Sequence, residues 1–124
     1  MDDPQRKANG TGLARLLRAT ACSYAGFVAA FRSEEAFRQE VLLCLVLLPL
    51  GCWLGDSNVE RALLVASLLL LLLVEILNTS IEVVVNRIST DRHELSGLAK
   101  DLGSTAVALA ILNALLVWGL VLLT

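Results

Sequence analysis

The chain has 124 residues, of which 56% are hydrophobic and 18% are charged, and its formal net charge is −2. A chain this short and this apolar is not composed like a soluble enzyme, and its charge balance gives no reason to expect nucleic-acid binding. Three cysteines without a CxxC pair argue against a disulfide framework and against a zinc site. The composition therefore predicts one small integral membrane domain over residues 1–124.

The N-terminal part is predicted to hold a surface helix. Residues 1–11 are rich in charged residues, proline and glycine, and we expect them to be disordered. Residues 13–31 place apolar side chains at spacings of three and four, which is typical of an amphipathic helix. Arg15 and Arg18 lie on the opposite side, which suits a helix in the membrane interface. The alternative is a helix packed on a soluble domain, but little soluble protein is present for it to contact.

Residues 34–54 predict the first membrane span. Ser33 is a plausible N-cap for this helix. The wholly apolar part, 41–54, is shorter than the roughly 20 residues that cross a bilayer. The helix reaches that length if Arg38 and Glu40 lie at the level of the headgroups.

Residues 62–85 predict the second span, and three polar residues interrupt it. At about 100° per residue, Glu75, Asn78 and Glu82 share one narrow face of a helix, and Asn86 falls on the same face. A carboxylate inside a membrane costs several kcal/mol unless it is compensated, so intramembrane acids are functional by default. This stripe predicts a site that holds a cation and does chemistry.

Residues 102–124 predict the third span, after a polar segment at 86–100. Gly97 is expected to interrupt any helix within that segment. Trp53 and Trp118 lie towards the ends of the first and third spans, as residues of an interfacial belt do.

The basic residues are unevenly distributed around the spans. Apart from Arg61 near the first loop, they precede the first span or lie between the second and third: Arg6, Lys7, Arg15, Arg18, Arg32, Arg38, Arg87, Arg92 and Lys100. The positive-inside rule then places the N-terminus and the second loop in the cytoplasm.

The different depths of Glu75 and Glu82 in the membrane suggest that the two acids have different roles. Glu82 lies near the cytoplasmic end of its span, and Glu75 lies about 10 Å deeper at 1.5 Å per residue. Glu82, with Glu34 from the first span, could hold a divalent metal, while Glu75 could meet a molecule arriving from the lipid. Phosphate-binding residue types lie on the same side of the membrane, namely Arg15, His93 and Lys100, with Asp101 beside them. The pattern predicts phosphoryl transfer to a lipid hydroxyl, without a P-loop.

Each of these residues also has an ordinary interpretation when taken alone. Asn78 could join helices, Glu34 could favour a helix start, and His93 could be a solvated loop residue. The stripe of Glu75, Asn78 and Glu82 together is much harder to explain as packing.

Three segments carry a resemblance to a known family. They are EEAFRQE at 34–40, VEILNTSIEVVVNRI at 74–88 and HELSGLAKDLGSTAV at 93–107. In these segments, and in order from about Gly12 to the third span, the chain resembles the small prokaryotic diacylglycerol kinases.

The resemblance implies a homotrimer of three-span subunits with an N-terminal surface helix, set in the cell inner membrane. It implies phosphorylation of diacylglycerol by ATP with Mg²⁺, giving phosphatidic acid, at composite sites between subunits. Glu75 would be the general base, Glu34 and Glu82 the metal carboxylates, and Asn78 a supporting residue. The remaining implied nucleotide contacts are Arg15, Asp91, His93, Lys100 and Asp101, and those on the lipid side are Arg15, Phe37, Arg38, Gln39 and Ser104.

The chain departs from the family pattern at two positions. Asn86 replaces a usual aspartate, which removes a charge, and Cys22 stands where related chains tend to carry tyrosine. An undecaprenol kinase of the same family is the nearest alternative, although AFRQE and HELSG favour the diacylglycerol type. A proton- or ion-coupled transporter using Glu75 as a relay is a different class, but three spans without an inverted repeat suit it poorly. A purely structural membrane protein is the third alternative.

Overall fold

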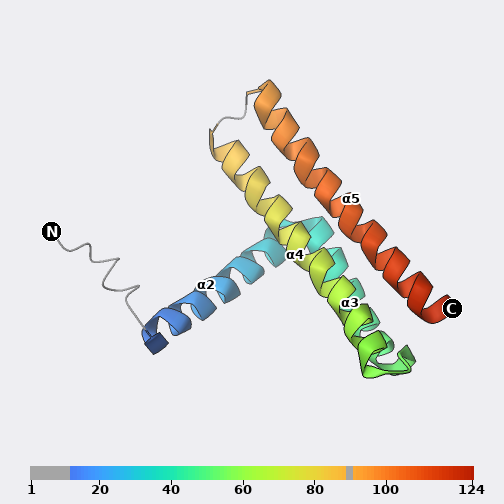
Figure 1. Cartoon of the computed structure of the whole chain (residues 1–124). Helices are drawn as coiled ribbons and strands as arrows, with labels where there is room; N and C mark the ends of the chain where they lie inside the picture. The colour runs from blue at the N-terminus through green and yellow to red at the C-terminus, as the bar shows by residue number, and fades with distance from the viewer. Residues whose placement is uncertain (1–11, 89–90) are drawn as a thin grey trace. The chain divides into compact units, whose positions relative to one another are not determined.

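The computed structural model of the chain describes residues 12–88 and 91–124, which form helices joined by short connections (Figure 1). The helices are α2 (Gly12–Ser33), α3 (Glu35–Leu54), α4 (Asn58–Ile88) and α5 (Glu94–Leu123). They group into two compact units, Met1–Ser33 and Glu34–Thr124, and each unit is described by itself. The predicted disorder of residues 1–11 lies outside the described residues, and the single-domain organisation stays a prediction.

The first unit consists of one helix in its described part, as predicted from the spacing. Leu13, Leu16 and Tyr24 of α2 are exposed within the chain. Such an exposed apolar stripe fits a membrane surface, and the interfacial location stays a prediction. Ser33 belongs to α2, where its hydroxyl donates to the Ala29 carbonyl at 2.8 Å, so its prediction as the N-cap of the next helix is wrong.

The second unit contains three helices that are long and apolar enough to cross a membrane, and these are α3, α4 and α5. The predicted spans 34–54, 62–85 and 102–124 fall on these helices. The prediction that Gly97 interrupts the polar segment is wrong, because α5 begins at Glu94 and continues through this glycine. Glycine costs a helix only about 1 kcal/mol relative to alanine. His93 caps the new start, since its Nδ1 accepts a hydrogen bond from the Leu95 N–H at 3.1 Å.

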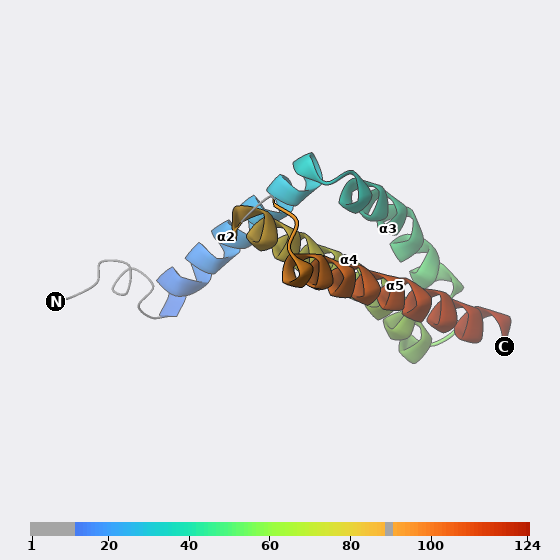
Figure 2. The same cartoon turned by 90° about the horizontal axis from the view of Figure 1, so that it is seen from above.

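Helix α4 forms the middle of this unit. Both views show α5 running alongside α4, and α3 returning beside its first half (Figure 1, Figure 2). The buried residues of α4 between positions 64 and 75 follow the i, i+3, i+4, i+7 pattern of one helix face. They are Leu64, Ser67, Leu68, Leu71 and Glu75, and Val85 is buried further along α4.

The turn between α3 and α4 is held by side chains of the turn and of the first residues of α4. The Glu60 N–H donates to the Ser57 hydroxyl at 3.1 Å, which caps the start of α4. The Asp56 N–H donates to Glu60 Oε2 at 2.9 Å, and Arg61 Nε donates to the Cys52 carbonyl at 3.0 Å. These bonds fix the reversal of the chain that places α3 beside α4.

Trp118 joins all three helices of the unit. Its indole N–H is shared between the Ser67 hydroxyl at 3.0 Å and the Leu64 carbonyl at 3.3 Å, both on α4. A Cβ added at Gly51 of α3 would lie 3.2 Å from the Trp118 ring, so the ring packs directly on that glycine. Trp118 is therefore a packing residue of the bundle as well as a residue near a helix end, whereas Trp53 is 79% exposed.

Candidate active site

The polar stripe of α4 lies on one face of the helix, as the spacing predicts. Glu75 is buried, with 7% of its surface exposed, while Asn78 and Glu82 are half-buried. Asn78 Nδ2 donates to Glu82 Oε1 at 3.5 Å, the long limit of a hydrogen bond. The stripe therefore faces the neighbouring helices of the unit at Glu75 and becomes more accessible towards Glu82.

Glu40 on α3 is a site residue that was not predicted from the sequence. Its side chain lies beside the carboxyl group of Glu75, within hydrogen-bonding reach. Its Oε2 is buried and has no hydrogen-bond partner among the described residues. The headgroup level expected for Glu40 stays a prediction, and its contact with Glu75 adds a role that the sequence analysis did not give it. The spacing of residues in α3 could have predicted this position. Glu40 is three residues after Phe37 and four before Cys44, so it shares the helix face on which both are buried.

Glu34 and Glu82 complete an acidic cluster around Glu75. Both carboxylates are near enough to act electrostatically on Glu75. No three His, Cys, Asp or Glu side chains in 12–88 and 91–124 are arranged to hold a metal by themselves. Mg²⁺ normally takes one or two carboxylates and completes its shell with phosphate oxygens and water. The donor chemistry of Glu34 and Glu82 fits that requirement.

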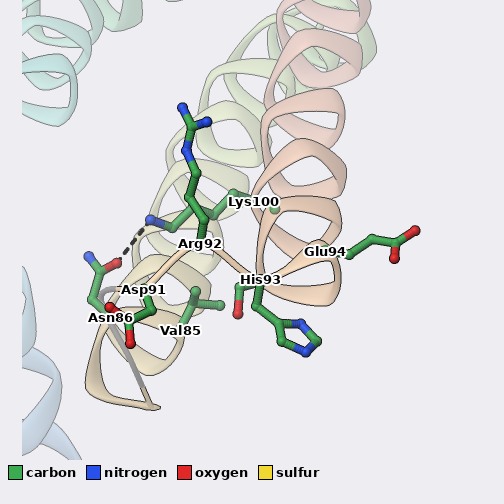
Figure 3. A pocket seen from close by; sticks show the side chains of 9 residues that line it. Val85, Asn86, Asp91, Arg92, His93, Glu94 and Lys100 are labelled. Carbon is green, nitrogen blue, oxygen red and sulfur yellow. Dashed lines mark hydrogen bonds between the residues drawn. The ribbon is translucent and has the colours of Figure 1, made fainter.

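A polar pocket of about 450 Å³ lies where α4 ends and α5 begins (Figure 3). Lys100 reaches from α5 towards the end of α4, and its Nζ donates to Asn86 Oδ1 at 2.9 Å. The predicted residues Asp91 and His93 line the same pocket. Arg92 lines it too, a second cationic side chain that was not among the predicted site residues. Glu94 lines it as well, so the pocket holds two acidic side chains beside two cationic ones, Arg92 and Lys100, of the kind that bind phosphate.

The remaining predicted residues line neither the polar pocket nor the apolar groove. Asp101 follows Lys100 on α5 and is exposed, as is Ser104. In the first turn of α3, Phe37 is fully buried, Arg38 is half-buried and Gln39 is exposed. Arg15 lies on α2 in the first unit, where its side chain is exposed.

An apolar groove of about 350 Å³ ends at the acidic cluster. Glu40 is the one charged residue among those that line it. The rest of its wall comes from α3, α4 and α5: Leu43, Cys44, Leu47, Leu68, Leu71, Ile111, Ala114, Leu115 and Trp118. The groove brings an apolar surface to the side chain of Glu40, which lies beside Glu75, an arrangement suited to an alcohol that carries hydrocarbon chains.

Comparison with known proteins agrees with this arrangement. The family model described as prokaryotic diacylglycerol kinase matches residues 21–122. The chain belongs to this family. A diacylglycerol kinase of Pseudomonas aeruginosa is 52% identical over 113 residues, which cover 91% of this chain and 92% of that protein.

More distant members of the diacylglycerol kinase family match over similar lengths. The diacylglycerol kinase of Escherichia coli K12 is 46% identical over 110 residues, covering 89% of this chain and 90% of that protein. That of Helicobacter pylori 26695 is 35% identical over 119 residues, covering 96% and 93%. The resemblance of the three sequence segments to this family is thereby confirmed. The family match includes α3, α4 and most of α5, which supply the acidic cluster, the polar pocket and the apolar groove.

Proposed function

We propose that this chain transfers the γ-phosphoryl group of ATP to the free hydroxyl of diacylglycerol, giving phosphatidic acid and ADP. The observation that carries the proposal is the position of Glu75, a buried carboxyl group beside Glu40 at the end of an apolar groove. Membership of the diacylglycerol kinase family supports it. A buried acid beside an apolar groove, on the same helix that contributes Asn86 to a pocket with cationic side chains, suits a lipid kinase.

The lipid substrate approaches along the apolar groove in this proposal. Hydrocarbon chains contact the leucines that line it, and the hydroxyl group then reaches the carboxyl groups of Glu40 and Glu75. Phe37, Arg38, Gln39 and Ser104 are proposed for the headgroup end, with Arg15 from α2. Holding the hydroxyl beside a fixed base converts an encounter into an oriented reaction, which is a large part of enzymatic rate enhancement.

Glu75 acts as the general base. It accepts the hydroxyl proton as the hydroxyl oxygen forms a bond to the γ-phosphorus, and the bond from that phosphorus to the bridging oxygen of ADP breaks. Glu40 lies beside Glu75 within hydrogen-bonding reach, and in this proposal the contact orients the carboxyl group of Glu75.

The nucleotide occupies the polar pocket between α4 and α5. Lys100 and Arg92 offer cationic donors to the phosphates, and Asn86 holds the Lys100 ammonium with a neutral oxygen. The amide in place of the usual aspartate leaves the full positive charge of Lys100 for the phosphates. Asp91, His93 and Asp101, together with Arg15, are proposed as further nucleotide contacts.

Glu34 and Glu82 would hold Mg²⁺ together with phosphate oxygens of ATP. When bound, the ion neutralises charge on the phosphates. Asn78 supports Glu82, since its Nδ2 points to that carboxylate. Along α4, Glu82 lies between Asn86, which lines the nucleotide pocket, and Glu75, the proposed general base. In this proposal Glu82 therefore lies on the path of the γ-phosphoryl group from the nucleotide to the lipid hydroxyl.

We also propose that the working enzyme is a homotrimer in the inner membrane with the polar pocket in the cytoplasm. The bias of basic residues towards the N-terminus and the second loop supports this orientation. Much of the apolar surface of α3, α4 and α5 is exposed in the single chain, and partner helices or lipid must cover it.

A two-lipid assay tests the proposal. The purified protein is incubated in mixed micelles with labelled ATP and either diacylglycerol or undecaprenol, with and without Mg²⁺. We expect Mg²⁺-dependent label in phosphatidic acid and little in undecaprenyl phosphate. Transfer to undecaprenol alone would establish the alternative lipid. No transfer to either lipid, together with proton flux in liposomes, would establish the transporter.

A further inference from the structure

Gly103 on α5 makes an unusually close approach to the polar stripe of α4. It is buried, and a Cβ added to it would collide with Asn78 Oδ1. The same Cβ would lie 3.3 Å from Asn78 Cγ and 3.7 Å from Ile81 Cδ1. The side-chain amide of Asn78 therefore rests directly on the backbone of α5, in space that any other residue at position 103 would fill.

The amide of Asn78 is held in an orientation that its own hydrogen bonds do not explain. Its Oδ1 is buried and finds no hydrogen-bond partner among the described residues. A buried acceptor without a partner costs about 1–3 kcal/mol. Within residues 12–88 and 91–124, the hydrogen bond of its Nδ2 is the long 3.5 Å contact with Glu82. The close contact with the backbone at Gly103 therefore restricts the position of the Asn78 amide more than its long hydrogen bond to Glu82 does.

Other glycines of the same helix do not share this property. A Cβ added at Gly97 or Gly119 would meet nothing within 4 Å. The contact at Gly103 is accordingly a local feature of one turn of α5. Packing alone would be served as well by an apolar residue on α4, without the cost of an unpartnered oxygen.

We propose that Gly103 is a positioning residue of the kinase site. By lacking a side chain, it admits the carbonyl oxygen of Asn78 against α5 and so turns the Nδ2 of this amide towards Glu82. The carboxylate of Glu82 is then held in one orientation for the metal and the phosphates. This inference rests on the proposed function, in which Glu82 is a metal ligand.

The first experiment compares Gly103→Ala with Gly119→Ala, the same substitution elsewhere on α5. Thermal unfolding is followed in detergent, and Mn²⁺ binding is measured by electron paramagnetic resonance with a non-hydrolysable ATP analogue present. Because residues that orient a metal ligand typically contribute 10- to 100-fold to metal affinity, Gly103→Ala should weaken Mn²⁺ binding by about tenfold or more. Gly119→Ala should bind as the wild type does. Equal Mn²⁺ affinity for the wild type and a folded Gly103→Ala protein would overturn the inference.

A double-mutant cycle separates positioning from packing. If Gly103 acts through Asn78, then adding Gly103→Ala to Asn78→Ala should cause no further loss of Mn²⁺ affinity, because the group that the methyl displaces is already absent. Additive losses would overturn the inference. If Gly103→Ala alone does not fold, the double variant should fold and match Asn78→Ala, and failure of the double variant to fold would count against the inference.

The two proposals fail in different ways. A wild-type protein that phosphorylates neither lipid contradicts the proposed function. An active wild type whose Mn²⁺ affinity survives Gly103→Ala contradicts only the positioning role.

Discussion

Replacing Glu75 by glutamine tests the centre of the proposed mechanism. Glutamine has nearly the shape of glutamate, so the buried position of Glu75 is refilled without a cavity. Its new NH₂ group faces the carboxyl group of Glu40, whose Oε2 lacks a partner in the described structure. We therefore expect stability in detergent to be preserved, or slightly increased.

The same change removes the proton acceptor. General-base catalysis contributes about 10²- to 10⁴-fold, so kcat should fall by that factor, equivalent to about 2.7–5.4 kcal/mol in the barrier. The KM for ATP should hardly change, because the polar pocket is about three turns away along α4.

The assay measures kcat with diacylglycerol and Mg-ATP at saturation, alongside thermal unfolding of each variant. Glu35→Gln is the matched control, since Glu35 is an exposed glutamate in the first turn of α3. Its kcat should equal that of the wild type. A Glu75→Gln protein that keeps a kcat within tenfold of the wild type would refute the assignment of Glu75 as the base.

Three further changes probe other parts of the molecule. Glu82→Gln should raise the Mg²⁺ concentration needed for half-maximal activity by about tenfold or more, and an unchanged titration would remove Glu82 from the metal site. Lys100→Met should raise the KM for ATP about tenfold or more through loss of a charge-assisted contact, which steady-state kinetics would reveal; an unaltered KM would contradict a nucleotide role for the pocket. Trp118→Phe removes the shared indole hydrogen bond, and should lower the unfolding free energy in detergent by about 0.6–1.7 kcal/mol. Unchanged unfolding would show that this junction contributes nothing to stability.

The line of Glu75, Asn78 and Glu82 could be predicted because it depends on the helical repeat alone. Once a segment is helical, residues separated by three, four or seven positions share a face, whatever surrounds them. The three spans follow in the same way, from lengths of apolar sequence that only a bilayer or a large core accommodates. The family resemblance rests equally on local segments, and the comparisons confirm it.

Contacts between helices could not be predicted from the helical repeat or from local sequence segments. The contact of Glu40 with Glu75 depends on the register between α3 and α4, which the sequence of neither helix fixes. Glu40 was therefore predicted only to lie at the level of the headgroups. Gly97 does not end the helix, because one glycine costs only about 1 kcal/mol and the cap from His93 stabilises the start of α5 upstream of it.

The amino-acid sequence alone determined the helical class, the membrane spans, the acid-bearing face of α4 and the family, since each is written in spacing along one chain. Only the tertiary structure decided that Glu40 joins Glu75, that Lys100 is held by Asn86, and that Asn78 rests on Gly103. These pairs depend on how helices pack side by side, and packing is set by the summed contacts of many residues rather than by any local pattern.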